Sequence, residues 1–357
     1  MTTHRKPIAL ALSGGGIRAM VFHLGVLRHL AERGLLESVV KISSVSGGSL
    51  LVGLLLQQNG MRWPTSERFL SHSLPTLRQS LCTCSLQWGA ARRLLNPLNW
   101  RYLLSRANLL ALSLRHEWKV TTTLADLPEV PEWSINGTTA ESGKRFRFKR
   151  TNIGEYTLGY ASAARFPLAT ALAVSAAFPG GFGPLVLDAG RYEWRKREWD
   201  APPETAEPAL PEFRRLHLYD GGVYDNMGLE PFFDAGRQLP KQEGCYLICS
   251  DAGAPLAPGF NMGPLNAFRL KRVADIMSEQ SRSLRVRTLV HYLRQTPSAG
   301  AYLSINTPVF SNKSCQSAEY ATSFPTTLRR LRSDEFDKLA LHGSAVAERA
   351  LNGFGLL

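Results

Sequence analysis

The sequence is poor in cysteine and contains no long apolar run. Its five cysteines are an odd number, form no Cys-x-x-Cys pair and have no histidine close to them in sequence. Because a disulfide framework or a zinc site needs such spacing, we expect reduced thiols and no bound metal. No apolar stretch is long enough to cross a membrane, and Ile8–Leu12 is too short for the core of a signal peptide. We therefore expect a cytoplasmic protein whose membrane contacts are peripheral.

Acidic residues are also in short supply, with 29 Asp and Glu against 42 Lys and Arg, a formal charge of +13 and a pI near 9.8. Such a charge attracts an anionic partner, either nucleic acid or a membrane surface rich in acidic lipids. The chain has no zinc-finger spacing and no RNA-recognition motif, so nucleic acid is not the expected partner. With 44% hydrophobic and 20% charged residues, the chain is typical of one globular domain over residues 1–357.

Short apolar strands alternate with apolar helices at the start of the chain. The patterns predict strands at 8–12 and 39–43, each followed by a glycine-containing turn and then by a helix, at 17–32 and 49–57. This order is the signature of a parallel sheet with helices packed on it. We therefore predict an α/β fold, a three-layer sandwich with a central, mostly parallel sheet flanked by helices.

The segment 61–130 has a different character. Between residues 68 and 119, arginines are interleaved with leucines and with Trp88, Trp100 and Trp118. The pattern predicts basic amphipathic helices inserted outside the sheet as a cap. Two roles stay open: a structural cap with its arginines in water, or a lid that docks on anionic lipid.

The rest of the chain continues the α/β pattern. It predicts a hairpin at 132–150, a helix at 161–178, an exposed excursion at 191–211, strands at 216–219 and 245–250, and helices at 267–294 and 326–351. We expect residues from about 260 to 357 to pack as a helical part on the same domain.

A glycine turn, Gly14-Gly15-Gly16, lies between the first strand and the first helix. Backbone N–H groups at a helix N-terminus form a cradle for negative charge, which can be an oxyanion or a phosphate. Taken alone, the turn also fits a dinucleotide-binding fingerprint, Gly14-x-Gly16-x-x-Ala19, with Glu37 at a suitable distance downstream.

A serine occupies the second strand-to-helix turn, Ser44-Val-Ser46-Gly47-Gly48. A nucleophile elbow is usually written G-x-S-x-G, because small residues let the strained turn approach its neighbours. Here Ser44 stands in place of the first glycine. A simple Ser/Gly helix cap is the competing interpretation.

The third motif is Asp220-Gly221-Gly222, at the end of the strand predicted at 216–219. A carboxylate at a strand end, with glycines that admit another chain segment, can act as general base for a serine hydroxyl. An ordinary Asp-Gly turn would look the same in isolation. Together, however, the three motifs supply an anion cradle, a nucleophile and a base in one chain.

On these motifs the sequence resembles the patatin-like phospholipases. Their loop G-G-G-x-[RK]-G is matched from Gly14 to Arg18 with Ala19 replacing the last glycine, their elbow is matched apart from Ser44, and their D-G-[GA] is matched at Asp220. Weaker likeness extends over residues 8–60 and 130–255.

The resemblance implies a catalytic dyad of Ser46 and Asp220 that needs no histidine and no cofactor. It also implies an oxyanion hole built from N–H groups of the glycine loop and elbow, Gly14, Gly15, Gly16 and Gly47, with positive charge from Arg18 near the oxyanion or the substrate headgroup. We expect His23 to be a packed core residue and Asp225 to be a turn or helix-capping carboxylate.

The function implied is a phospholipase A or lysophospholipase that cleaves fatty-acyl esters at an anionic phospholipid membrane. Two alternatives stay open: a catalytically silent or ligand-activated lipid-binding protein on the same fold, and a nucleotide-binding protein that uses Gly14–Arg18 as a phosphate cradle. An unknown activator is a possible partner, and the sequence does not indicate the oligomeric state.

Overall fold

A computed structural model describes residues 6–103, 105–178, 183–198, 201–256, 258–260, 268–309 and 315–353. Within these residues the strands are β1 (Ile8–Leu12), β2 (Val39–Ser44), β3 (Glu132–Thr139), β4 (Arg145–Phe148), β5 (Asn152–Glu155), β6 (Gly159–Ser162), β7 (Leu185–Asp188), β8 (Trp194–Lys196), β9 (Glu207–Ala209), β10 (Arg215–Asp220), β11 (Phe233–Asp234), β12 (Leu239–Pro240), β13 (Tyr246–Asp251) and β14 (Gly300–Ser304).

The helices of the described residues are α1 (Gly16–Glu32), α2 (Gly47–Gln58), α3 (Ser66–Arg68), α4 (Leu74–Thr83), α5 (Leu86–Arg93), α6 (Arg106–Glu117), α7 (Leu168–Ser175), α8 (Gly222–Asp225), α9 (Phe268–Gln295), α10 (Cys315–Ser323) and α11 (Ser333–Gly353). A 3₁₀ segment, η3 (Pro97–Tyr102), joins α5 to α6.

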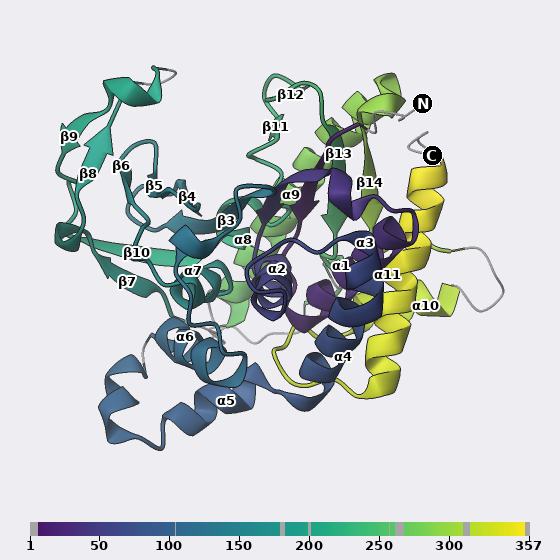
Figure 1. Cartoon of the computed structure of the whole chain (residues 1–357), viewed down its shortest axis with the longest axis horizontal. Coiled ribbons are helices and arrows are strands. Elements are labelled where there is room, and N and C mark those ends of the chain that lie inside the picture. Colours follow the sequence, from purple (N-terminus) through teal and green to yellow (C-terminus); the bar gives the residue numbers. More distant parts are fainter. Residues whose placement is uncertain are drawn as a thin grey trace.

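A mixed sheet occupies the centre of the molecule (Figure 1). Its neighbouring strands β14, β13, β1, β2 and β3 are all parallel, and the strands beyond β3 pair antiparallel. Helices flank the parallel strands on both faces, so the predicted α/β sandwich is confirmed.

Strand β1 shows why the parallel half has helices on both faces. Ile8, Leu10 and Leu12 belong to the core that includes α1 and α11, whereas Ala9 and Ala11 belong to a second core that includes α9. Successive side chains of a strand point to opposite faces, and a strand buried on both sides is apolar at every position. The run Ile-Ala-Leu-Ala-Leu is such a strand.

Two strands approach each other along the same edge of β3. Strand β2 runs parallel to β3 and ends with Ser44 opposite Ile135, while β10 runs antiparallel and ends with Asp220 opposite Gly137. Their carboxyl ends are thus separated by two residues of β3, a rise of roughly 7 Å. This convergence brings the segments after β2 and at the end of β10 together.

Three predicted segments differ from the structure. The helix predicted at 161–178 is confined to α7, because β6 occupies 159–162 and Pro167 stands at the N-cap of α7. The C-terminal helix begins at Ser333 rather than at residue 326. The predicted excursion 191–211 contributes β8 and β9 to the sheet.

Helices α3 to α6 and η3 fill most of the segment 61–130, and α5, η3 and α6 project from the body at the lower left of Figure 1. Helix α6 packs on α7, which lies against β3 and β10. No helix in the described ranges is long and apolar enough to span a membrane.

Helices α1 and α11 approach closely at Gly25, and this contact gives a test of the packing. A Cβ at Gly25 would meet the carbonyl oxygen of Ala340 and, at 2.8 Å, the backbone nitrogen of Ser344. Helix propensity alone predicts that Gly25→Ala stabilises the protein by about 1 kcal/mol. We expect instead that overpacking lowers the free energy of unfolding by about 1–3 kcal/mol, measured by urea denaturation.

The control is Gly190→Ala, whose Cβ would contact only the Asp188 carboxylate at 3.4 Å. We expect it to change stability by less than about 0.5 kcal/mol. A stabilised Gly25→Ala protein would contradict the close packing of α1 on α11.

Candidate active site

Ser46 lies at a strained turn between β2 and α2. Its backbone dihedrals are φ 49° and ψ −116°, a region that a residue with a side chain rarely adopts. The glycines that follow permit this turn: a Cβ at Gly47 would meet the carbonyl oxygen of Gly16, and a Cβ at Gly48 would lie 2.6 Å from that of Leu12. This geometry is that of a nucleophile elbow, in which the hydroxyl is exposed at the tip of the turn.

The residue that departs from the usual elbow pattern, Ser44, has a structural role. Its hydroxyl oxygen accepts a hydrogen bond from the Trp133 indole N–H at 2.8 Å and lies 2.9 Å from the Ser49 hydroxyl. The Ser49 hydroxyl is 2.9 Å from that of Ser175, which donates to the carbonyl oxygen of Asn136 at 2.7 Å.

The two ends of this chain decide its direction. An indole N–H only donates and a carbonyl oxygen only accepts, so each hydroxyl donates to the next, from Ser44 to Ser49 to Ser175. The Ser46 backbone N–H reaches both the hydroxyl and the carbonyl oxygen of Ser175, each at 3.0 Å. The chain therefore supports the strained turn from behind. Sequence reasoning missed these residues, because no local motif joins 44, 49, 133 and 175.

Asp220 lies buried at the end of β10. Its carboxylate accepts a hydrogen bond from the Gly222 N–H at 2.7 Å, and the Ser46 side chain lies beside it. Burial raises the pKa of Asp220 to about 7, although the Gly222 N–H and the Ser46 side chain both act in the opposite direction. The structure thus brings Ser46 and Asp220 together, and the carboxylate titrates near neutral pH.

The glycine loop presents backbone N–H groups beside the serine. Gly15 and Gly16 have φ of 140° and 61°, which leave no place for a side chain. The Gly14 N–H donates to the Asn226 carbonyl oxygen at 2.9 Å and is already used. Among the described residues, the N–H groups of Gly15, Gly16 and Gly47 have no hydrogen-bond partner, and they are the donors left for an oxyanion.

Residues 324–328 hold the loop in place. The Thr327 carbonyl oxygen accepts from the Ile17 N–H at 2.9 Å, and the Phe324 carbonyl oxygen accepts from the Arg18 guanidinium at 2.7 Å. This segment is irregular instead of helical, so the late start of α11 has a direct consequence for the site.

Arg18 is buried behind the glycine loop and does not line the pocket in front of Ser46. Burial lowers its pKa to about 10, partly offset by the nearby charge of Asp251. Its guanidinium links the loop to the Phe324 carbonyl oxygen. That Arg18 stabilises the charge of an oxyanion or a substrate headgroup stays a prediction.

His23 and Asp225 have structural surroundings. The His23 ring contacts the Ser250 hydroxyl at 2.7 Å and the Ser13 carbonyl oxygen at 3.0 Å, and burial lowers its pKa to about 4. Asp225 accepts from the backbone N–H groups of Met227 and Glu230 at 3.1 and 2.8 Å, as a turn carboxylate does, because α8 ends at Asp225 and residues 226–230 form turns.

A mostly apolar pocket of about 530 Å³ opens in front of Ser46. Its walls come from the glycine loop, the segments around α5 and α6, the end of α7 and residues 326–328. The lining residues are Gly16, Ser46, Leu86, Gln87, Ala90, Ala91, Leu94, Leu103, Arg106, Leu109, Leu110, Ala176, Phe178, Thr326, Thr327 and Leu328. Such a pocket suits a hydrocarbon chain that reaches a nucleophile at its base.

The described residues bring together no group of three or more His, Cys, Asp or Glu side chains that could hold a metal ion. The four cysteines whose side chains are described are free, and the Cys315 side chain lies outside the described residues. Glu37, which the dinucleotide interpretation would need for a ribose, accepts from the backbone N–H and the hydroxyl of Ser66, each at 2.6 Å. Its carboxylate therefore caps α3.

Comparison with known proteins adds a family match. The family model described as patatin-like phospholipase matches residues 10–233, more than half of the chain. No curated protein sequence matches significantly.

Solved structures show the same fold at low sequence identity. Human GIVD cytosolic phospholipase A2 is 15% identical with a TM-score of 0.57, and the match covers 98% of this chain and 59% of the human chain. Its complex with methyl γ-linolenyl fluorophosphonate is 16% identical with a TM-score of 0.56, over 98% and 58% of the two chains. The chain thus spans less than two thirds of the human protein.

The raised pKa of Asp220 predicts a pH-dependent gain in stability for Asp220→Asn. Between about pH 4 and pH 7 the unfolded wild type loses the Asp220 proton while the folded protein keeps it, so the wild type loses stability as the pH rises. Relative to the wild type, Asp220→Asn is expected to gain roughly 2–4 kcal/mol over this window, measured by thermal unfolding in matched buffers. A difference that stays constant from pH 4 to pH 8 would contradict this assignment.

Proposed function

The chain belongs to the patatin-like phospholipase family, and from that premise we propose that it hydrolyses fatty-acyl esters of glycerophospholipids as a phospholipase A or lysophospholipase. The observation that carries the proposal is the Ser46 hydroxyl, held at a strained elbow beside the buried Asp220 carboxylate. This hydroxyl faces an apolar pocket, and the N–H groups of Gly15, Gly16 and Gly47 beside it have no hydrogen-bond partner among the described residues.

In the proposed mechanism Asp220 accepts the Ser46 proton as the hydroxyl oxygen attacks the ester carbonyl carbon. The N–H groups of Gly15, Gly16 and Gly47 stabilise the oxyanion of the tetrahedral intermediate. Collapse of this intermediate transfers the Asp220 proton to the departing alcohol and leaves the acyl group on Ser46. Water then attacks the acyl ester, with Asp220 again as base, and the fatty acid leaves.

The raised pKa of Asp220 matches this cycle. In the proposed cycle Asp220 acts first as a base and then as an acid. A carboxyl group with a pKa of about 7 suits both steps at neutral pH, whereas an ordinary aspartate, with a pKa of about 4, is a weaker base.

The proposal predicts loss of fatty-acid release from mixed phospholipid vesicles in Ser46→Ala and Asp220→Asn, each by at least about a thousandfold. The wild-type rate is expected to fall as the pH drops below about 7, because the base becomes protonated. The matched control is Ser71→Ala, whose exposed hydroxyl donates to the Glu67 carbonyl oxygen outside the site.

A fluorophosphonate gives a second, independent readout, since one is bound in the human structure of the same fold. Attack by the serine oxygen on phosphorus expels fluoride, so a labelled protein gains mass on Ser46. Labelling without lipid release would favour a hydrolase that acts on another ester or needs an activator. A wild type that neither labels nor releases fatty acid would favour the silent lipid-binding alternative.

We also propose that the cap docks on an anionic membrane. The segment 88–103, termed the cap tip, exposes five large apolar side chains: Trp88, Leu95, Leu98, Trp100 and Leu103, with 50–83% of each accessible. Exposed tryptophans and leucines of this density are unusual on a surface bathed only by water. They suit the boundary between lipid headgroups and acyl chains.

Charge and position support the same role. Arg92, Arg93 and Arg101 lie in the cap tip, and long-range attraction to acidic lipids follows from such cations. Leu94 and Leu103 also line the pocket in front of Ser46. An acyl chain that leaves the bilayer at the cap tip would therefore enter the pocket directly.

Removing the two exposed indoles tests this docking. We expect Trp88→Ala/Trp100→Ala to lower vesicle binding and vesicle hydrolysis at least about tenfold, with little change on a soluble short-chain ester. The control pair, Leu210→Ala/Leu341→Ala, removes exposed apolar side chains elsewhere. Equal losses on vesicles and on the soluble ester would assign these tryptophans to the pocket and contradict membrane docking.

A further inference from the structure

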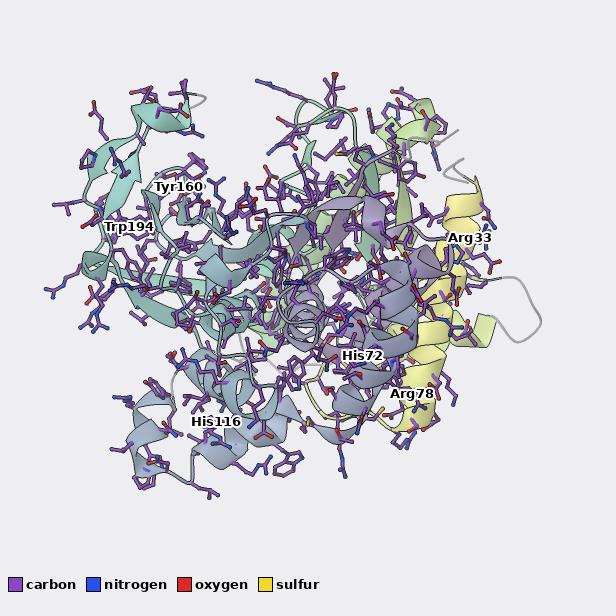
Figure 2. The ribbon with its side chains drawn as sticks, viewed as in Figure 1. Arg33, His72, Arg78, His116, Tyr160 and Trp194 are labelled. Atoms are coloured by element: carbon purple, nitrogen blue, oxygen red, sulfur yellow. The ribbon has the colours of Figure 1, made fainter. Side chains whose placement is uncertain are left out.

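The antiparallel half of the sheet has two chemically different faces. On one face, directly paired residues of successive strands form an apolar row: Ile135, Phe148, Ile153, Ala161 and Trp194. All five are buried in the main core. Tyr160 and Trp194, labelled in Figure 2, mark the outer strands of this half.

The opposite face carries cations and an aromatic ring. The next row across the same strands is Asn136, Arg147, Gly154, Tyr160 and Arg195. Because side chains alternate along a strand, Arg145 lies on this face together with Arg147. The two arginines are half-buried, whereas Phe146 between them is fully buried on the other side.

The two arginines and Arg197 have no carboxylate partner. Within the described residues, none of the three forms an ion pair. Arg145 donates to the Asn136 side-chain oxygen at 2.9 Å, and the Nε of Arg147 is buried with no hydrogen-bond partner. Like charges gathered in partly desolvated surroundings repel one another, and a buried polar atom without a partner is costly.

Nearby carboxylates are already engaged by other cations. Glu132 pairs with Lys149, and Glu230 pairs with Lys241 and Arg285 at 2.8 and 2.9 Å. Burial lowers the pKa of Arg145 and of Arg147, and each is lowered further by a neighbouring arginine. Attraction to Glu230 and Asp225 offsets part of this effect at Arg145, and attraction to Glu132 does so at Arg147, but within the described residues neither arginine forms an ion pair with a carboxylate.

We propose that this face binds a phosphate-bearing ligand, held by Arg145 and Arg147 with Arg197 beside them. The site is separate from Ser46 and does not depend on the hydrolytic reaction. Guanidinium groups match phosphate oxygens in a bidentate manner, and a phosphate monoester carries close to two negative charges at neutral pH.

The surroundings of Arg147 fit this role. Its guanidinium carbon lies 4.1 Å from the centre of the Tyr160 ring, a stacking contact that fixes the plane of the group. Gly154 lies between the two residues in the row, and the missing side chain leaves the space that the stacking needs. A guanidinium stacked on one side keeps its N–H edges free for an anion.

Pyrophosphate is the first probe, with Ser46→Ala protein so that no lipid is turned over. We expect pyrophosphate to raise the midpoint of thermal unfolding in a saturable manner at constant ionic strength, while sodium chloride does not. Arg147→Gln is expected to weaken the apparent affinity at least about tenfold. Arg62→Gln, at an exposed position, removes the same charge and should leave the affinity unchanged.

A second arm identifies the source of the phosphate. Vesicles with phosphatidate, a phosphate monoester, are compared with vesicles of equal charge made with phosphatidylglycerol, a diester. If phosphatidate binding depends on Arg147 and pyrophosphate does not displace the vesicles, the ligand of this face is a lipid headgroup. If pyrophosphate displaces them effectively, the ligand is a soluble phosphate compound.

Two results would overturn the proposal. One is a pyrophosphate effect of equal size in the parent, Arg147→Gln and Arg62→Gln proteins, which would reflect net charge only. The other is no Arg147-dependent binding of pyrophosphate or phosphatidate, while Arg147→Gln remains folded with an unchanged or higher unfolding midpoint. That second result would show that the arginines repel one another without serving a ligand.

Discussion

The convergence of β2 and β10 on one edge of β3 is the constraint on which the site depends. Both strands pair with β3, one parallel and one antiparallel, and their carboxyl ends stop two positions apart. Hydrogen bonding of the ladder therefore sets the separation between the elbow and Asp220, with no need for a flexible loop. The glycines after each strand allow close backbone contacts with neighbouring segments: Gly48 with Leu12, and Gly221 with Asn136.

The site is held in conformations that a stable fold would otherwise avoid. Ser46 has a positive φ, and Asp220 is buried where its ionised form is disfavoured. The directed chain from Trp133 through Ser44, Ser49 and Ser175 anchors the strained turn to the sheet and to α7. Two-sided burial of the parallel strands supplies the rigidity behind it. The strained turn at Ser46 and the buried carboxylate of Asp220 thus meet at the proposed catalytic site.

The two halves of the sheet have different surroundings, and each half offers a different surface. In the parallel half, with helices on both faces, the pocket in front of Ser46 opens at the carboxyl ends of the strands. The antiparallel half is apolar on the face that packs into the core, and cationic on the other. The proposed ester-cleaving site and the proposed anion-binding face thus belong to different parts of one sheet.

Local patterns in the sequence determined the strand-turn-helix order, the elbow at Ser46, the glycine loop and the Asp-Gly-Gly end of β10, because each depends on a few neighbouring residues. Tertiary structure alone decided the rest. Four features join residues far apart in sequence: the contact of Ser46 with Asp220, the hydrogen bonds of Ser44, the irregular 324–328 segment, and the face that carries Arg145 and Arg147. Helix propensity favoured a longer helix at 161–178 and at 326–351, and sheet pairing and packing against the glycine loop overrode it, since non-local contacts outweigh small local preferences.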